Sequence, residues 1–372
     1  MSLQAGRRIP FFNYQRAFVD REDEYVAIFR DVLRRGAFIQ QRDLAAFEAH
    51  LAAYLPVHHA IGVGNATDGL IMLWRAVDLR PGDEVVLPSH TMVATAAAVH
   101  FAGGTPVLAD CGPDHLLDPG AAEALVSPRT RAICPVQLNG RVCDMDAVCA
   151  LAARHDLLVI EDAAQALGAR FRGRRAGTFG LGAAFSFYPA KLLGCFGDGG
   201  AVVTNNDTVA AQVHKLRDHG RNPHGEVERW GLNSRLDNLQ AALLDAQLAR
   251  HEGTIIARRR LAGIYDELLR DVPEVTLPPG PDDPDRFDVY QNYEIEADHR
   301  DALRAHLEAR GIGTIVQWGG KAIHQFAALG FHAALPATER LCARAVMLPL
   351  NPALDDDDAR YVAETVRAFY GR

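Results

Sequence analysis

The sequence lacks an apolar segment long enough to cross a bilayer. Its longest apolar stretches, around Ile61 and Ala97, are interrupted by glycine, histidine or charged residues, whereas a membrane-spanning helix needs about 20 apolar residues. The N-terminal sequence MSLQAGRRIPFF has two arginines but no apolar run after them and no small-residue cleavage site, which argues against a secretory signal. We therefore expect a cytoplasmic protein with no membrane partner.

Positive charge and paired cysteines are also scarce. The 39 Lys and Arg residues face 47 Asp and Glu residues, a net charge of −8, which disfavours general attraction to nucleic acid or anionic lipid. The six cysteines are irregularly spaced and form no C-x-x-C pair, so we expect neither a disulfide framework nor a structural metal. Residues 355–358, four aspartates, fit the first turn of the last helix better than a metal cluster.

The 372 residues, 48% of them apolar, are sufficient for two or three domains with a sizeable core. Between residues 59 and 204, short β-rich runs alternate with helix-like segments, which predicts an α/β fold with a mostly parallel sheet covered on both faces. The predicted strands are 59–63, 84–88, 106–110, 131–137, 157–162, 183–188 and 200–204.

The C-terminal third has a different pattern. About thirty residues after Asp237 predict a long helix or a broken pair of helices, which would lead to a second domain. A Pro-rich acidic stretch, short strands and further helices follow. We therefore predict a large domain with its N-terminal segment over residues 1–250 and a smaller α+β domain over residues 251–372.

A polar turn follows the first predicted strand, in the segment GVGNATDG at residues 62–69. It lacks the GK[ST] ending of a phosphate loop and the third glycine of the dinucleotide fingerprint. Because the turn leads into a helix, the unpaired amides near Asn65, Ala66 and Thr67 would form a small anion site. An ordinary helix cap by Asn65 or Thr67 is the alternative.

In two further segments, an ionisable residue lies at or shortly after the end of an apolar predicted strand. In LLVIEDAAQ, Asp162 lies at the C-terminal end of a predicted central strand, and a buried carboxylate needs a cation or hydrogen-bond donors. Gln165, one helical turn later, would reach the same ligand. In FSFYPAKLLG, Ser186 precedes Lys191 by five residues, and apolar surroundings would lower the pKa of the lysine enough for it to condense with an aldehyde. A structural ion pair and a lysine reaching to solvent are the alternatives.

These three features together are what pyridoxal 5'-phosphate requires, and the sequence resembles the DegT/DnrJ/EryC1/StrS family of sugar aminotransferases, which are fold-type I enzymes of this cofactor. The motifs that carry the resemblance run in family order along the chain: NATDG, PSHTMVATA, EDAAQALGA, FSFYPAK, GDGGAVVTN, LRDHGRN and GLNSRLDNLQAA. The family fold implies a large domain with a mostly parallel seven-stranded sheet between helices, plus the smaller C-terminal domain.

The resemblance also implies a role for individual residues. Asp162 would pair with the ring nitrogen of the cofactor, Gln165 would face its hydroxyl, and Lys191 would bind its aldehyde and move the proton. The phosphate would contact Asn65, Ala66, Thr67 and Ser186, and Asn233 of a second subunit, in a homodimer with shared sites.

His90 matches the position that stacks on the ring, with nearby Met92 and a surface histidine as alternatives. We assign Tyr188, Arg235, Trp318 and His324 to the substrate; core and surface roles remain open for Trp318 and His324, and a solvated role for Arg235.

The expected function is transfer of an amino group from L-glutamate to a nucleotide-linked keto-sugar. The segment 313–331 most resembles the branch that aminates carbon 4 of dTDP-4-keto-6-deoxyglucose, whose methyl group suits an aromatic wall. A 3-keto nucleotide sugar or a cyclitol ketone is the alternative substrate. A dehydratase is disfavoured because relatives of that type have histidine where this chain has Lys191. A non-catalytic binding or regulatory protein is the alternative from another class.

Overall fold

The computed structural model describes residues 7–372. The main sheet has seven strands in the spatial order β1-β9-β8-β5-β4-β2-β3, and only β9 is antiparallel to its neighbours. This confirms the predicted mostly parallel α/β sheet. The strands are β1 (His59–Val63), β2 (Glu84–Pro88), β3 (Thr105–Ala109), β4 (Thr130–Ile133), β5 (Leu158–Asp162), β8 (Gly182–Ser186) and β9 (Gly200–Thr204).

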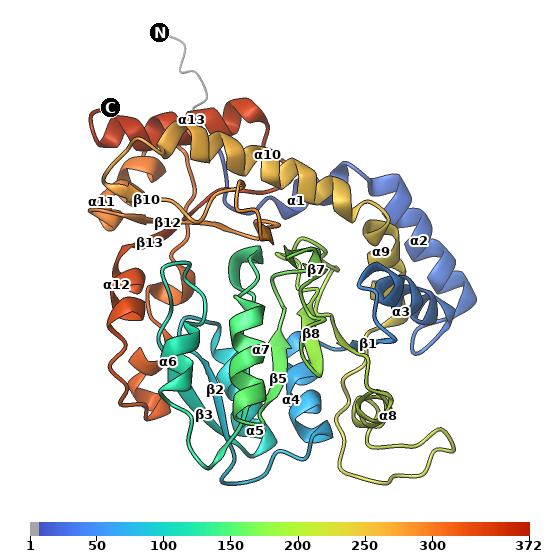
Figure 1. Ribbon diagram of the computed structural model, residues 1–372. Helices are drawn as coiled ribbons and strands as arrows, with labels where there is room; N and C mark the ends of the chain where they lie inside the picture. Colours follow the sequence, from blue (N-terminus) through green and yellow to red (C-terminus); the bar gives the residue numbers. More distant parts are fainter. Residues whose placement is uncertain (1–6) are drawn as a thin grey trace.

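Alternate residues of each strand pack against helices on opposite faces. In β2, Val85 and Leu87 belong to the same core cluster as α4 (Ala66–Ala76), α5 (Val93–Ala102) and α8 (Asp207–Leu216). Val86 lies in the core on the other face, with α6 (Pro119–Glu123) and α7 (Met145–Arg154). Burial on both faces explains why the strands are continuously apolar. Figure 1 shows the sheet between these layers.

The N-terminal segment forms three helices beside the β1 edge of the sheet. They are α1 (Tyr14–Val19), α2 (Glu22–Arg35) and α3 (Arg42–Tyr54), and α3 packs with α9 (Asn238–Leu248) against β1, β8 and β9. Before α1, Ile9 forms a parallel bridge with Ile312 and packs in a second hydrophobic core. The other buried residues of this core lie between Leu261 and Val366, and we call this part of the structure the C-terminal unit. The boundary at residues 250/251 remains a prediction, and the contact of Ile9 links the two ends of the chain.

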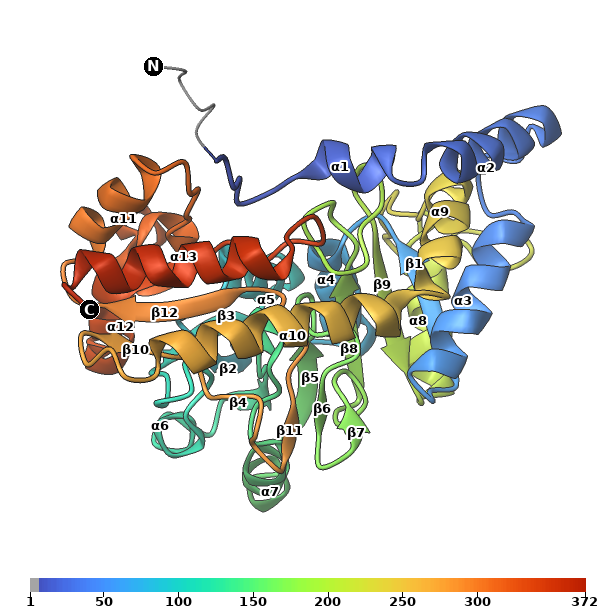
Figure 2. The ribbon, with the colours of Figure 1, turned by 90° about the horizontal axis from the view of Figure 1, so that it is seen from above.

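The expected long helix after Asp237 is a broken pair, because α9 ends before residue 250 and α10 (His251–Leu269) begins there. Helix α10 extends from the large sheet to the C-terminal unit, where it packs against α13 (Asp356–Phe369) (Figure 2). The C-terminal unit also contains the sheet β10-β12-β13 (Val275–Thr276, Tyr293–Ala297 and Ala345–Leu348) and helices α11 (Arg300–Glu308) and α12 (Pro336–Arg344). Asp355 caps α13, as expected for the run of aspartates.

Small elements complete the structure. After α10 and β10, the strand β11 (Arg286–Phe287) pairs with β6 (Arg170–Phe171), which forms a hairpin with β7 (Arg174–Arg175), and these three strands make a separate small sheet. The short 3-10 turns are η1 (Leu138–Gly140), η2 (Gln317–Gly319), η3 (Ile323–Gln325) and η4 (Ala327–Leu329). Over residues 7–372, no helix is both long and apolar enough to cross a membrane.

Arg258 connects α10 to the C-terminal unit through buried polar contacts. Its Nη1 donates to the carbonyl oxygens of Tyr290 (3.0 Å), Gln291 (3.2 Å) and Leu350 (2.6 Å). Burial lowers the pKa of the guanidinium to about 10, which still leaves it charged at neutral pH. One side chain therefore satisfies carbonyls of two separate segments.

We expect Arg258→Met to lower the midpoint of thermal unfolding, because buried carbonyls left without a donor cost about 1–3 kcal/mol each. Arg260→Met is the matched control on the same helix, since the Arg260 side chain is 52% exposed and pairs with Asp356 at the surface. Circular dichroism melts of the two variants should differ. Equal midpoints would show that Arg258 does not hold the two segments together.

Candidate active site

The predicted site residues gather at the carboxyl edge of the parallel strands. Strands β1, β2, β5 and β8 all end at this edge, which is where open α/β sheets bind ligands. Helix α4 begins at Ala66, directly after β1, and Asp162 is the last residue of β5. Lys191 lies in the turn after β8, where its backbone N–H donates to the Tyr188 carbonyl at 2.8 Å.

The start of α4 and Ser186 lie on either side of Gly200. In the ladder, Gly200 is opposite Val63 on one side and Ser186 on the other. A Cβ at Gly200 would lie only 2.8 Å from the backbone nitrogen of Ala66, so this close approach requires glycine. The Asn65 side chain caps the helix by accepting from the Asp68 N–H at 2.8 Å.

The first amides of α4 remain available to an anion. Ala66 and Thr67 are the first two residues of the helix, and amides at these positions have no carbonyl acceptor in a preceding turn. The Ser186 oxygen accepts from the Tyr188 N–H at 3.3 Å, which leaves its hydroxyl proton free to donate. The predicted cap and the predicted anion site therefore coexist at one helix start.

Asp162 and its neighbour Glu161 have different surroundings. Glu161 is fully buried and accepts from the amides of Gly177, Phe179 and Gly180, so its role is structural. Asp162 is 5% exposed and accepts from the Thr95 hydroxyl at 2.7 Å and from the Ala164 N–H at 3.1 Å. Desolvation raises the pKa of Asp162, while the Thr95 bond and the charge of Lys191 act in the opposite direction. A cationic ligand would stabilise its ionised form.

Lys191 is one of only three lysines in the sequence. Burial lowers the pKa of its amine to about 8, and the negative charge of Asp162 partly opposes this shift. Within residues 7–372, the structure records no hydrogen bond or ion pair for the amine. Lys191 and Tyr188 line an open cleft of about 640 Å³, together with aromatic residues of the N-terminal segment, namely Phe12, Tyr14 and Tyr25. A nucleophilic amine therefore faces a space large enough for a substrate.

Gln165 is held at the carboxyl side of β5 by the backbone of Asn139. The Asn139 N–H donates to Gln165 Oε1 at 2.8 Å. A backbone N–H only donates, so the accepting atom must be the amide oxygen, and this defines the orientation of the side chain. Over residues 7–372, no hydrogen bond of Gln165 Nε2 is recorded, so its two protons remain available to a ligand.

His90 lies near the C-terminal unit, and it is only 3% exposed, so it is not a surface histidine. Its Nδ1 is 3.1 Å from the His115 carbonyl, and its ring centroid is 5.4 Å from that of Trp318. Met92 is 48% exposed and caps α5 one turn before Thr95, which binds Asp162. Met92 therefore precedes the residue that binds Asp162 on the same helix, and the role of His90 as a stacking residue stays a prediction.

The expected substrate residues do not all lie together. Tyr188 is 51% exposed beside Lys191, whereas Arg235 pairs with Asp218 at 2.7 Å in the segment after α8. Trp318 has a left-handed backbone (φ 47°) and packs against the large-domain core. His324 is buried, with its ring nitrogens 2.7 Å from the Ser89 hydroxyl and 3.3 Å from Glu339. Since both nitrogens of His324 have partners, its surroundings favour a structural role.

Sequence reasoning missed Thr95 and Asn139. Thr95 lies inside the quoted motif PSHTMVATA, three residues after Met92, so its helical spacing could have placed it beside the site. Asn139 carries no comparable signal, because its relation to Gln165 depends on how the turn after β4 folds. Among the described residues, no cluster of three or more His, Cys, Asp or Glu side chains could hold a metal ion.

Comparisons with known proteins identify the family of the chain. Residues 19–367 match the DegT/DnrJ/EryC1/StrS aminotransferase family. The dTDP-3-amino-3,4,6-trideoxy-alpha-D-glucose transaminase of Streptomyces venezuelae is 41% identical, covering 98% of this chain and 97% of that protein.

Two solved structures are also similar. The crystal structure of S. venezuelae DesV has a TM-score of 0.94 at 41% identity and covers 98% of this chain and 99% of that one. The NtdA structure from Bacillus subtilis with bound cofactor PMP has a TM-score of 0.90 at 27% identity, covering 100% and 87%. Together with the geometry, these matches confirm the fold-type I architecture expected from the motifs.

The amine of Lys191 should react with an aldehyde reagent in a pH-dependent way. With a pKa of about 8, the neutral amine is half formed near pH 8 and decreases about tenfold for each lower pH unit. We expect reductive trapping, followed by peptide mass spectrometry, to give this profile at Lys191. Asp162→Asn removes the charge that favours the ammonium form, so the midpoint should move to lower pH.

The exposed Lys321 is the internal control in the same digests. Its reaction profile should be the same in the parent protein and in Asp162→Asn, because its side chain is exposed to solvent. A Lys191 profile that coincides with that of Lys321 in both proteins would contradict the inferred environment of the amine.

Proposed function

Because the chain belongs to the DegT/DnrJ/EryC1/StrS aminotransferase family, we propose that it transfers an amino group from L-glutamate to a nucleotide-linked keto-sugar. The observation that carries this proposal is the placement of Lys191 and Asp162 at one sheet edge, beside the free amides of α4. A non-catalytic binding protein would have no need of a buried lysine whose pKa is lowered toward neutrality.

The family depends on pyridoxal 5'-phosphate, and the residues of this chain fit that group. The amides of Ala66 and Thr67 and the Ser186 hydroxyl are donors for its phosphate. Asp162 is a buried acceptor for the ring nitrogen, and Gln165 has free amide protons for the ring hydroxyl.

The chain's own residues then move the proton. When bound, the cofactor supplies an electron sink for the charge left on the substrate carbon. Lys191 Nζ has a pKa close enough to neutrality to accept the proton from that carbon and return it, a contribution of roughly 10²–10⁴-fold in rate. Asp162, as a carboxylate, keeps the proton on the ring nitrogen, and the Thr95 hydroxyl orients it.

The finer part of the proposal is which carbon of the sugar receives the amino group. The resemblance of segment 313–331 favours carbon 4 of dTDP-4-keto-6-deoxyglucose, with a 3-keto sugar as the alternative. The S. venezuelae relative matches this chain over nearly its whole length and is named for a 3-amino sugar. We adopt the 3-keto alternative on this support, with Tyr188 as the aromatic wall beside Lys191.

We expect dTDP-linked 3-keto-6-deoxyglucose to be turned over at least about tenfold faster than the 4-keto isomer with glutamate as donor. Product formation by mass spectrometry measures the preference, and Lys191→Ala, which should be inactive, is the control. The reverse preference would restore the carbon-4 assignment. Faster turnover of a free cyclitol ketone would contradict the nucleotide-sugar substrate. A bound cofactor whose absorption does not change with glutamate would favour the binding-protein alternative.

We further propose a homodimer in which Asn233 reaches the phosphate group of the partner's site. Asn233 is exposed and forms a backbone bridge with Asp218, whose carboxylate also holds Arg235. Within residues 7–372, no hydrogen bond is recorded for the Asn233 side-chain amide. A rigid backbone that presents an unused amide to solvent suits a contact made in the dimer.

An apolar surface on the N-terminal helices supports the dimer. Phe29 and Leu33 of α2 are 45% and 48% exposed, and Phe38 and Ile39, which follow the helix, are 52% and 41% exposed. Four large apolar side chains within eleven residues are unusual on a monomer surface and typical of subunit contacts.

Mixing Lys191→Ala subunits with Asn233→Asp subunits should restore activity. Each variant alone should be inactive, whereas a hybrid dimer would contain one site with both residues intact. Random exchange predicts about a quarter of the parent activity. The control is a mixture of Lys191→Ala with the double variant, in which every site lacks the lysine. No recovery after confirmed subunit exchange would count against a shared site.

A further inference from the structure

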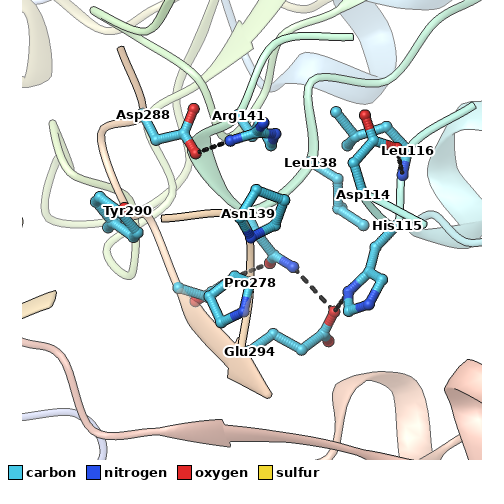
Figure 3. Close-up of a pocket in the computed structure, with 12 residues that line it drawn as sticks. Asp114, His115, Leu116, Leu138, Asn139, Arg141, Pro278, Asp288, Tyr290 and Glu294 are labelled. Carbon is cyan, nitrogen blue, oxygen red and sulfur yellow. Dashed lines mark hydrogen bonds and ion pairs between the residues drawn. The ribbon is translucent and has the colours of Figure 1, made fainter. Parts of the chain in front are cut away.

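A small, partly enclosed cavity with both polar and apolar lining lies between the large sheet and the C-terminal unit (Figure 3). Its volume is about 30 Å³, room for about one water molecule. One wall comes from residues 114–116 and 138–141 of the large domain, and the other from residues 278–279 and 288–294. In Figure 3, dashed lines join the Glu294 carboxylate to the side chains of Asn139 and His115.

Asn139 joins this cavity to the predicted cofactor site. Its backbone is left-handed (φ 55°), a conformation that asparagine tolerates better than most residues. Its Oδ1 accepts from Asn292 Nδ2 (2.8 Å) and Gln317 Nε2 (2.6 Å), and its Nδ2 donates to Glu294 Oε1 (3.1 Å). The same residue donates its backbone N–H to Gln165. One asparagine therefore connects Gln165 with three side chains from the C-terminal third of the chain.

Glu294 is a fixed anchor for Asn139 because it is charged and buried. It is 2% exposed, and its Oε1 lies 3.4 Å from His115 Nδ1 and 3.9 Å from His90 Nε2. Despite burial, the hydrogen bond and the positive charge of His115 lower the pKa of Glu294.

The surrounding charges keep this anchor ionised. His115 also faces Glu296 at 3.3 Å, and the two glutamates raise the pKa of His115 to about 9. Arg344 of α12 pairs with Glu296 from the other side at 3.3 Å. A buried carboxylate that has such partners resists displacement, because leaving it unpaired costs several kcal/mol.

We propose that Asn139 and Glu294 are positioning residues for the cofactor, which hold the Gln165 amide with its protons toward the ring hydroxyl. This inference rests on the proposed function. Strand β12, which carries Glu294, thereby influences the hydrogen bond that Gln165 makes. This positioning requires the Asn139 side chain, because its amide group donates to Glu294 and accepts from Gln317 at the same time.

Asn139→Gly is the sharpest test, because glycine keeps the left-handed backbone and the N–H while it removes all three side-chain bonds. Loss of one oriented hydrogen bond should weaken pyridoxal 5'-phosphate binding about fivefold to tenfold, measured by fluorescence titration. When a hydrogen bond is donated to the ring hydroxyl oxygen of the cofactor, that oxygen binds the neighbouring titratable proton less strongly. The pH midpoint of the visible absorption band should therefore rise, by about half a unit or more.

Three further proteins make the result decisive. Glu294→Gln keeps an acceptor for Asn139 and should shift the midpoint less than Asn139→Gly. Asp114→Ala changes the wall of the same cavity without touching Asn139 or Glu294 and should leave binding and midpoint unchanged. Gln317→Leu, which removes one bond to Asn139, replaces Asn139→Gly if that variant does not fold, with a smaller shift in the same direction.

The outcomes separate this inference from the proposed function. Normal binding by the parent protein, with unchanged affinity and midpoint in the folded Asn139→Gly variant, would overturn the positioning role alone. Equal shifts in Asn139→Gly and Asp114→Ala would also overturn it, since they would indicate a general loosening of the cavity. A parent protein that binds no pyridoxal 5'-phosphate would overturn the proposed function and this inference together.

Discussion

Burial of a carboxylate and an amine at one edge of the sheet is the constraint on which the site depends. Asp162 and Lys191 each lose hydration, and desolvation moves the pKa of each toward the neutral form. Their mutual attraction opposes these shifts without cancelling them. The pKa values of the two groups are thus moved toward each other, which suits a carboxylate that pairs with a ring cation and an amine that exchanges protons near neutral pH. The fold maintains this arrangement by placing them at the ends of adjacent parallel strands, β5 and β8.

The contact between the large sheet and the C-terminal unit combines apolar packing, such as that of Val289 and Ile323, with buried hydrogen bonds. Arg258 binds three carbonyls, and Asn139 gathers Glu294, Asn292 and Gln317. Apolar surfaces can slide with little change in energy, whereas buried hydrogen bonds require particular partners at particular distances. A contact of this kind defines how the C-terminal unit sits over the site, so residues that never touch a ligand can still determine where Gln165 points.

The sheet could be predicted closely because both faces of its strands are buried. Three strands, 59–63, 84–88 and 200–204, have the expected bounds, and the others shift by a few residues. The largest difference is at β4, expected to residue 137 but ending at Ile133, since Pro135 has no N–H for the ladder. The candidate site could also be predicted from the sequence, because Asp162, Ser186 and Lys191 are polar residues at or near the ends of apolar runs. Position along the chain could not decide between His90 and Met92, which lie two residues apart on opposite sides of a turn.

The sequence by itself determined the order of strands and helices, the family, and the residues that carry charge at the strand ends, because these follow from local pattern and motif. Only the tertiary structure separated Glu161 from Asp162: one is enclosed by three backbone amides and the other faces the site. It also brought Thr95 to Asp162 and Asn139 to Gln165, and it gave both ring nitrogens of His324 partners. Such contacts join residues far apart in the chain, and their partners are set by how strands and loops pack, which no local periodicity encodes.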